Sequence, residues 1–484
     1  MDDDLREDEV FGFEKIELLK NTLGTCVQTL VLEPYYICKD FRNLYTHFYS
    51  KKIIERPFWC IRLHFFNKSI VLKDVANIFL KPKNYQESYL GYSIIQPVPH
   101  ACVGRTIIDP YKIGHDSGRF HCLRSQTIAN IQGADYPIEG YPYRSQSAEA
   151  TVCAHAALWG VCRYLSDKYP VYGEVYPYDL IRMTGDTAGR RVPYRGMTYS
   201  DYSSILTQFG CYPSIIHFKS YPSQSSPRLD WRKDKDAHYD LYSYIESGFP
   251  TLISYKGHVV SAIGHTLRDI LPPKAVPEKN DFYNSSELMD SIIVVDDNFP
   301  PYQELKHTGT ARQYYGDGYS TLEHKPCIDS ISAAVVPLPE KAFLRPKDAR
   351  FLAYAFFETR EIKSILSKLV HGNTKIIART FLTSSNAFKN RLRERVTKAG
   401  DNVYLPFSLS MPHFIWVTEI SPMSIYNQRE CFAEVVFDAS CHYNEGNPIY
   451  ARIGKTVLDN TGKILNNCAV LDRWGQYTHN LGEL

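Results

Sequence analysis

Apolar side chains recur at helical spacing in residues 148–165, 199–209 and 362–370. In each segment the apolar positions fall about three and four residues apart, which places them on one face of a helix. Gly210 follows the second segment and Gly372 follows the third, and glycine commonly ends helices. We therefore predict a helix in each segment.

Runs rich in β-branched and aromatic residues predict strands elsewhere in the chain. The predicted strands are 58–66, 92–99, 214–218, 251–255, 258–263, 292–295, 375–381, 413–420 and 431–438. A short helix is expected over 241–246, and the polar stretch 221–238 is expected to be an exposed loop.

The order of these elements changes twice along the chain. The first part mixes strands with helical pieces, the middle part places a helix before several strands, and the last part again alternates helix and strand. We predict an α+β fold with an N-terminal α/β module over 1–135, a central domain over 136–340 and a C-terminal α/β module over 341–484. The last module is a candidate surface for a substrate or a protein partner.

Composition narrows the choice of partners. The chain has 484 residues, of which 44% are hydrophobic and 22% charged, close to the average for soluble globular proteins. Its formal net charge of +2 gives no general attraction to nucleic acid or anionic membrane. The acidic N-terminus lacks the apolar run of a signal peptide, and no segment reaches the about 18–20 apolar residues of a membrane span. We expect a cytoplasmic protein with no nucleic-acid or membrane partner.

Twelve cysteines occur singly, with no Cys-x-x-Cys pair. This spacing argues against a structural zinc knuckle, and a reducing compartment argues against a disulfide framework. The sequence also has no His-x-x-x-His pair of the kind that binds zinc on a helix. We therefore expect no metal centre and no cofactor.

One cysteine lies where a reactive thiol is chemically plausible. Cys153 falls near the start of the apolar helix predicted over 148–165, after a polar stretch that contains Gln146. A helix N-terminus carries unpaired N–H groups and a partial positive charge, which favour the thiolate form of cysteine. The same N–H groups, with the amide of Gln146, are suitable donors for an oxyanion hole.

Two later segments supply a base and a carboxylate. His258 follows Gly257 at the start of an apolar strand, and Asp296 and Asp297 follow the strand 292–295. A carboxylate beside an imidazole holds the ring in one tautomer and stabilises its charged form. Cysteine, histidine and aspartate, 105 and 38 residues apart, provide the parts of a catalytic triad.

Each of these residues also has an ordinary structural explanation. Most helix cysteines are buried, a Gly-His pair on a strand is often structural, and Asp-Asp-Asn after a strand commonly forms a turn. Their order and their placement at a helix start and at strand ends favour the catalytic interpretation. His155 would point away from Cys153 on the helix, and the basic cluster 391–395 is expected to be a solvated helix face.

The same segments resemble the papain-like cysteine peptidase superfamily over about residues 140–305. The run from Gln146 to Cys153-Ala-His-Ala-Ala-Leu is similar to the Gln…Cys-Gly-x-Ala-x-Leu signature of bacteriocin-leader peptidases, related thiol peptidases and phytochelatin synthases. The stretch Gly248-x-Pro…Gly257-His258-Val-Val-x-x-Ile-Gly264 resembles their histidine block, and Ile293-Val-Val-Asp296 resembles the strand before their catalytic Asp.

The resemblance implies a papain-like catalytic domain, in which a helix bearing the Cys packs on an antiparallel sheet bearing the His and Asp. It implies Cys153 as nucleophile, His258 as base, Asp296 as the orienting residue and Gln146 in the oxyanion hole. There are departures. Gln146 lies seven residues before Cys153 where six is usual, Ala154 replaces a common Gly, and Asp297 is an alternative to Asp296.

The expected function is that of a thiol protease, a hydrolase that cleaves a peptide or isopeptide bond through a thioester on Cys153. An acyltransferase of the transglutaminase or phytochelatin-synthase type would use the same residues with an amine as acceptor. A third interpretation is a non-catalytic papain-like module that binds a protein partner. Degenerate modules usually lose the Cys or the His, and this chain keeps both.

Overall fold

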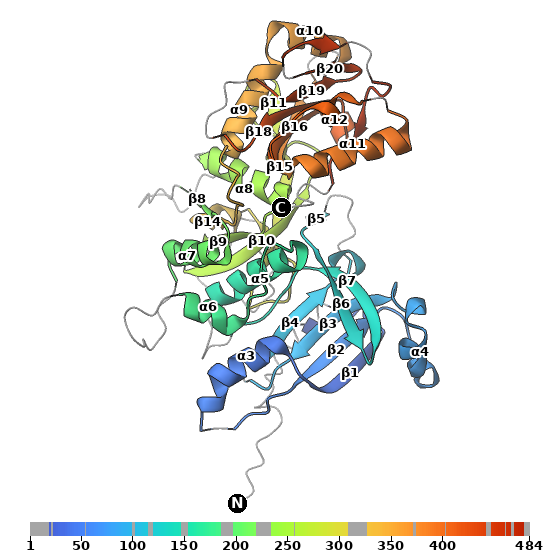
Figure 1. Cartoon of the computed structure of the whole chain (residues 1–484), viewed down its shortest axis with the longest axis vertical. Coiled ribbons are helices and arrows are strands. Elements are labelled where there is room, and N and C mark those ends of the chain that lie inside the picture. The colour runs from blue at the N-terminus through green and yellow to red at the C-terminus, as the bar shows by residue number, and fades with distance from the viewer. Residues whose placement is uncertain are drawn as a thin grey trace, which may run out of the picture. The chain divides into compact units, whose positions relative to one another are not determined.

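The computed structural model describes residues 19–20, 23–53, 55–98, 102–114, 120–146, 153–184, 197–218, 234–255, 257–307, 327–370, 374–401, 403–441, 447–459, 461–465 and 469–478. They form two compact units, and Figure 1 labels many of their helices and strands. Unit 1 comprises Met1–Ile215, Pro250–Thr266 and Ser291–Val335, and unit 2 comprises Ile216–Phe249, Leu267–Asp290 and Val336–Leu484. The division at residues 135 and 340 stays a prediction.

The first part of unit 1 is an antiparallel sheet with a β-hairpin packed on it. In spatial order the strands of the sheet are β1 (Thr29–Tyr36), β2 (Cys60–Phe66), β3 (Tyr89–Ile95) and β4 (Val103–Ile108). The hairpin and the two connecting helices are β6 (Ser125–Ile131), β7 (Ala134–Gly140), α3 (Lys39–His47) and α4 (Val75–Leu80). Phe66 and Tyr89 of the sheet share one buried core with Tyr136 of the hairpin.

The second sheet of unit 1 carries the strands of the candidate site. Its order is β13 (Gln303–Lys306), β12 (Met289–Val295), β10 (His258–Leu267), β9 (Thr251–Tyr255), β14 (Ala333–Val336) and β8 (Ser214–His217), with β5 (Phe120–Cys122) paired to β10. β9 pairs antiparallel with β10, so that Tyr255 lies opposite His258. Gly257 between them has φ 79°, a left-handed conformation that glycine adopts without strain. This turn fixes His258 at the first position of β10.

Three helices complete the described part of unit 1 around this sheet: α5 (Cys153–Lys168), α6 (Pro177–Met183) and α7 (Tyr199–Phe209). The described part of α5 starts at Cys153 and is buried along most of its length. The hydroxyl of Ser261 on β10 donates to the carbonyl oxygen of Ala157 at 3.2 Å, which joins α5 to the sheet. α7 ends at Gly210 with φ 103°, as predicted. Residues 148–152 of the first predicted helix lie outside the described residues.

Unit 2 is built on a sheet with the spatial order β11 (Phe282–Asn284), β15 (Ile376–Ser384), β16 (Phe414–Pro422), β18 (Ala433–Asp438), β19 (Tyr450–Ile453), β20 (Thr456–Leu458) and β21 (Ile464–Leu465). β11 runs parallel to β15, and the pairs that follow are antiparallel. A separate pair is formed by β17 (Glu430–Cys431) and β22 (Trp474–Gly475). The helices are α8 (Lys235–Ser247), α9 (Pro346–Phe357), α10 (Arg360–Leu369), α11 (Ser385–Ala399), α12 (Leu405–Ser408) and α13 (Met423–Tyr426). Short 3-10 helices in the two units cover Tyr49–Lys51, Leu72–Asp74, Pro82–Asn84, Pro110–Lys112, Ser285–Leu288 and Ile328–Ser330.

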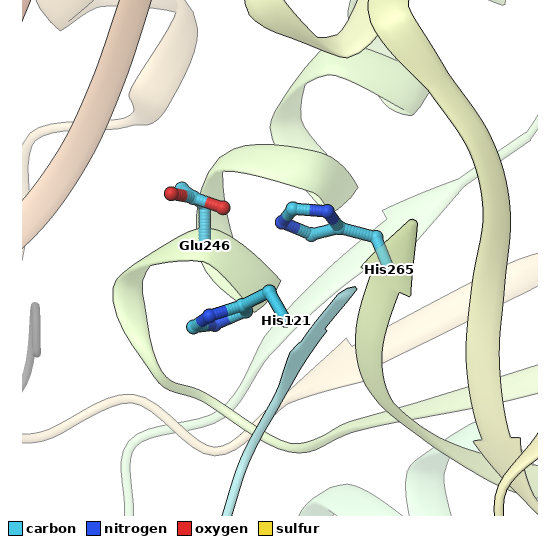
Figure 2. Close-up of side chains that lie close together, drawn as sticks. All are labelled: His121, Glu246 and His265. Carbon is cyan, nitrogen blue, oxygen red and sulfur yellow. The ribbon is translucent and has the colours of Figure 1, made fainter. Parts of the chain in front are cut away.

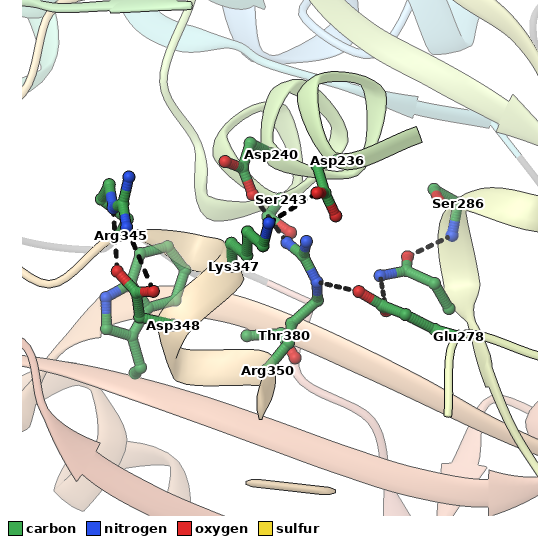
Figure 3. Close-up of polar contacts among 12 residues, drawn as sticks. Asp236, Asp240, Ser243, Glu278, Ser286, Arg345, Lys347, Asp348, Arg350 and Thr380 are labelled. Atoms are coloured by element: carbon green, nitrogen blue, oxygen red, sulfur yellow. Dashed lines mark hydrogen bonds and ion pairs between the residues drawn. The ribbon is translucent and has the colours of Figure 1, made fainter. Parts of the chain in front are cut away.

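Ion pairs join α9 to α8 and to Glu278 within unit 2 (Figure 3). The Arg350 side chain is fully buried and donates to Asp240 at 2.8 Å and to Glu278 at 3.1 Å. Lys347, one turn earlier on α9, donates to Asp236 of α8 at 2.6 Å. Carboxylates on both sides of Arg350 offset the cost of burying its charge.

A row of charged residues crosses the unit 2 sheet. Arg379, Glu419, Glu434 and Arg452 lie opposite one another on four neighbouring strands, and all are buried. Arg379 pairs with Glu419 at 2.7 Å, and Glu434 also binds Arg395 of α11 at 3.0 Å. The prediction of a solvated face over 391–395 is therefore wrong at Arg395, which is 6% exposed.

The mixed helices and antiparallel sheets confirm the α+β class predicted from the sequence. The predicted loop 221–238 is wrong at its end, because residues 235–238 belong to α8. Its earlier residues 221–233, like the predicted cap Gly372, lie outside the described residues. Among the helices described, none combines the length and the apolar character needed to cross a membrane.

Candidate functional site

The structure brings three predicted residues to one place in unit 1. Cys153 is the first described residue of α5, His258 is the first residue of β10, and Asp296 directly follows β12. β10 and β12 are neighbours in the sheet, so the start of one strand meets the end of the other. α5 is joined to β10 through Ser261, as described above.

Asp296 is the carboxylate that contacts His258. The Nε2 atom of His258 lies 3.0 Å from Oδ1 of Asp296 and 3.8 Å from Oδ1 of Asp297. The first distance is that of a hydrogen bond and the second is not. Asp296 is fully buried, and its other oxygen accepts a hydrogen bond from the hydroxyl of Tyr255 at 3.4 Å. The geometry therefore places Asp296, rather than Asp297, within hydrogen-bonding distance of the imidazole.

The side chain of Cys153 lies close enough to His258 to contribute to the pKa of the imidazole. Burial of His258 disfavours its charged form, but the hydrogen bond with Asp296, the interaction with Cys153 and the charges of Asp296 and Asp297 outweigh burial and raise the pKa of His258 to about 11. His258 is therefore an imidazolium at neutral pH, and an imidazolium beside a cysteine is a typical environment of reactive thiolates.

Asn298 links Gln146 to this group. The Gln146 Nε2 atom donates to Oδ1 of Asn298 at 3.4 Å, and the Asn298 side-chain nitrogen lies 3.5 Å from Nε2 of His258. The backbone N–H of Asn298 donates to Oδ1 of Asp296 at 2.9 Å. Asn298 thus contacts three of the predicted residues. Sequence reasoning gave it no role, although it follows the two acidic residues directly.

Tyr202 of α7 lies on the cysteine side of the site. Burial and the nearby charge of Cys153 raise the pKa of Tyr202. Its hydroxyl donates to the carbonyl oxygen of Met197 at 2.9 Å. Nothing in the sequence pattern singled out this tyrosine, because its position depends on how α7 packs near α5.

His155 has the character of a core residue. It is 2% exposed, and its Nε2 lies 3.5 Å from the hydroxyl of Thr184. Burial and the positive charge of Arg144 lower the pKa of His155 to about 4, so it is neutral at pH 7.

Two groups of side chains in unit 1 offer metal-ligand atoms. Atoms of His258, Asp296 and Asp297 lie within 4.8 Å of one another, although the 3.0 Å contact between His258 and Asp296 is already a hydrogen bond. Figure 2 shows His121 on β5 and His265 on β10, which face each other across the strand pair with ring centres 5.1 Å apart. Two imidazoles make up half of the ligand set of a structural zinc site.

Comparison of the sequence with models of known protein families and with curated proteins gave no match.

Proposed function

We propose that this protein is a cysteine peptidase of papain-like type, with Cys153 as nucleophile, His258 as base and Asp296 as the residue that orients His258. The observation that carries the proposal is the 3.0 Å hydrogen bond between His258 and Asp296, together with the placement of Cys153 close to the same imidazole. A nucleophile in contact with a base that is itself oriented by a third group is the general arrangement of nucleophilic catalysis.

The surrounding elements support a papain-like arrangement. The cysteine is the first described residue of a buried helix, while the histidine and the aspartate lie at the start of one strand and just after the end of its neighbour. These are the positions that the resemblance over residues 140–305 implies for the three residues.

The reaction begins with attack of the Cys153 thiolate on the carbonyl carbon of an amide. The new C–S bond converts the carbonyl oxygen to an oxyanion, and His258 gives its proton to the amine as the C–N bond breaks. A thioester remains on Cys153. Water, losing a proton to His258, attacks this thioester; the carboxylic acid leaves, and the thiolate and imidazolium are restored.

Asp296 keeps His258 oriented through these steps. Its carboxylate is buried and has three donors around it: His258, Tyr255 and the backbone N–H of Asn298. Such an environment fixes one tautomer of the imidazole and stabilises its charged form. The N–H groups at the start of α5 and the amide of Gln146 are the proposed donors to the oxyanion. The hydrogen bond from Gln146 to Asn298 keeps the Gln146 side chain next to a residue that contacts His258.

The resemblance favours a peptide or isopeptide bond as substrate. The alternative acceptor is an amine, which would make the protein an acyltransferase with the same nucleophile. Incubating one peptide substrate with and without an added primary amine separates the two, because only transfer produces the new amide.

The proposal is tested by selective alkylation. Iodoacetamide at low concentration near pH 6.5, followed by intact-mass measurement, should give one fast adduct that is lost in Cys153→Ala and slowed in His258→Ala. An ordinary thiol is only about 1% ionised at that pH. Cys162→Ala is the matched control on the same helix, because burial raises the pKa of Cys162 well above its ordinary value. Cys441→Ala removes background labelling of an exposed thiol.

Two results would contradict the proposal. Labelling of Cys153 no faster than that of Cys441, and independent of His258, would make Cys153 an ordinary helix cysteine. A fast adduct without turnover of any peptide or amine would leave the non-catalytic binding module as the better interpretation.

A further inference from the structure

Arg144 is a buried cation in the segment that leads from β7 to α5. The residue is 4% exposed, and its Nε and Nη1 atoms have no hydrogen-bond partner among the residues described. Its guanidinium lies over the ring of Trp159 on α5, 5.6 Å from the ring centre. An aromatic face attracts a cation, but unlike a carboxylate or a carbonyl group it has no oxygen that accepts a hydrogen bond from the N–H groups. The charge of Arg144 is therefore only partly compensated.

Other buried arginines show what full compensation requires. Arg350, Arg379 and Arg395 each bind a carboxylate, and the pKa of each is raised because these partners outweigh burial. The pKa of Arg144 is lowered because burial outweighs the attraction of Asp40, and Arg105 adds repulsion. Among the described arginines with a shifted pKa, Arg144 is the one for which the shift is downward.

The neighbourhood of Arg144 contains more positive than negative charge. The Oδ2 atom of Asp40 forms an ion pair with Arg105 at 2.7 Å. The Oδ1 atom of Asp40 has no hydrogen-bond partner among the described residues. The guanidinium of Arg56 lies over the ring of Tyr49, and Tyr49 also interacts electrostatically with Arg144. The buried Nε of Arg56 has no hydrogen-bond partner among the described residues. Glu174, 4.0 Å from Arg105, is held mainly by Arg163.

We propose that Arg144, together with Arg56, binds a small oxyanion, namely a carboxylate or a phosphate group. Such a group supplies several acceptor oxygens and the negative charge that this part of unit 1 lacks. Its source is either a free ion or the carboxylate of a peptide, and the two are distinguished below. The site does not depend on the proposed peptidase activity, although Arg144 lies two residues before Gln146 in the chain.

The first measurement is thermal unfolding of the full chain in increasing phosphate, with sodium chloride at equal ionic strength as the control. A ligand that binds only the folded state stabilises it by RT ln(1 + L/Kd), where L is the free ligand concentration, so Tm rises with the logarithm of the ligand concentration above Kd. Wild type should show such a rise of Tm in phosphate, and chloride should not reproduce it. Arg144→Met should abolish this rise, because Met keeps a side chain against Trp159 but has no charge or N–H donor.

A second readout concerns the protein without added anion. Arg144→Met should have a Tm equal to or above that of wild type, since it removes a buried charge that lacks a partner. Arg350→Met is the matched control and should lower Tm, because it leaves Asp240 and Glu278 without their cation.

Two peptides identify the source of the oxyanion. A peptide with a free C-terminal carboxylate and the same peptide amidated are compared by calorimetry and by their effect on Tm. Binding of the free-acid peptide alone identifies a peptide carboxylate, and binding of phosphate alone identifies a free ion. The proposal is overturned if no oxyanion raises Tm above the chloride control, or if Arg144→Met retains the full effect.

Discussion

Asp296→Asn tests the electrostatics of the site without the need for a substrate. The substitution keeps the size of the side chain, removes its charge and replaces one of its two acceptor oxygens by an NH2 donor. In the wild-type protein the pKa of His258 is about 11, against an ordinary value of 6.5. At about 1.36 kcal/mol per pKa unit, the difference corresponds to ~6 kcal/mol in favour of the imidazolium. Asp296 contributes to it through both a hydrogen bond and its charge.

The expected result is a large loss of thiol reactivity near neutral pH. Without Asp296, the pKa of His258 falls toward 6.5, and the imidazolium gives way to neutral imidazole as the pH rises through that range. A hydrogen bond to a charged group contributes about 1.5–3 kcal/mol. If loss of this bond is passed on to the thiolate, alkylation of Cys153 slows by roughly 10–100-fold, since about 1.4 kcal/mol is a factor of ten.

The assay is the second-order rate of iodoacetamide addition to Cys153, followed by intact mass from pH 5 to 9. Asp297→Asn is the matched control, because its carboxylate lies 3.8 Å from His258. It should slow alkylation less than Asp296→Asn does. An unchanged rate in Asp296→Asn, with a folded far-ultraviolet spectrum, would refute the reasoning. A larger effect of Asp297→Asn would instead assign the orienting role to Asp297.

The remaining predictions concern stability. The pKa of His258 is raised in the folded state, so the stabilising contribution of His258 is complete below pH 6.5 and is lost as the pH rises toward about 11. In urea unfolding, the stability of His258→Ala should therefore lie furthest below that of wild type at acidic pH and approach it at alkaline pH. A difference that grows with pH would contradict this. Gly264→Ala should be strongly destabilising, because a Cβ there would lie 2.1 Å from the carbonyl oxygen of His121. Gly173→Ala is the control, because a Cβ at Gly173 meets no atom within 4 Å and its backbone is not left-handed. Equal losses of Tm in the two variants would mean that β5 moves away readily.

Local sequence signals predicted the elements of the site well. The glycines at 210 and 257 mark a helix end and a strand start because both positions have positive φ. The apolar run before Asp296 is a buried strand, so the carboxylates were correctly expected at a strand end. The distinction between Asp296 and Asp297 is a matter of which face each side chain takes, and the structure places Asp296 nearer to His258.

Features that depend on tertiary contacts could not be predicted. Arg395 belongs to a basic cluster in the sequence. It pairs with Glu434 of β18, which lies 39 positions further along the chain. Asn298 contacts Gln146 across 152 positions, and no local pattern records that contact. Arg144 is one of many arginines in the sequence, and its distinction is that it is buried with no carboxylate bound to it among the residues described.

The path of the chain has a consequence for how the site is assembled. The proposed triad lies entirely in unit 1, yet its residues come from three separate stretches, which end at Ile215, Thr266 and Val335. Between them the chain contributes residues 216–249 and 267–290 to unit 2. The second of these includes β11, which pairs with β15 of the C-terminal region.

A fragment cut at residue 340 would therefore lose the partner strand of β11 while keeping every residue of the proposed triad. It would also remove Arg350 and leave Asp240 and Glu278 without the cation that binds both. Removing one partner of a buried ion pair typically costs about 3–5 kcal/mol, a large share of the stability of an ordinary domain. In the same fragment, the strands next to His258 and Asp296 stay connected through residues 267–290, which would no longer have the unit 2 sheet to pair with. The catalytic proposal is therefore best tested by point substitutions in the full chain, where a loss of reactivity can be separated from a loss of folding.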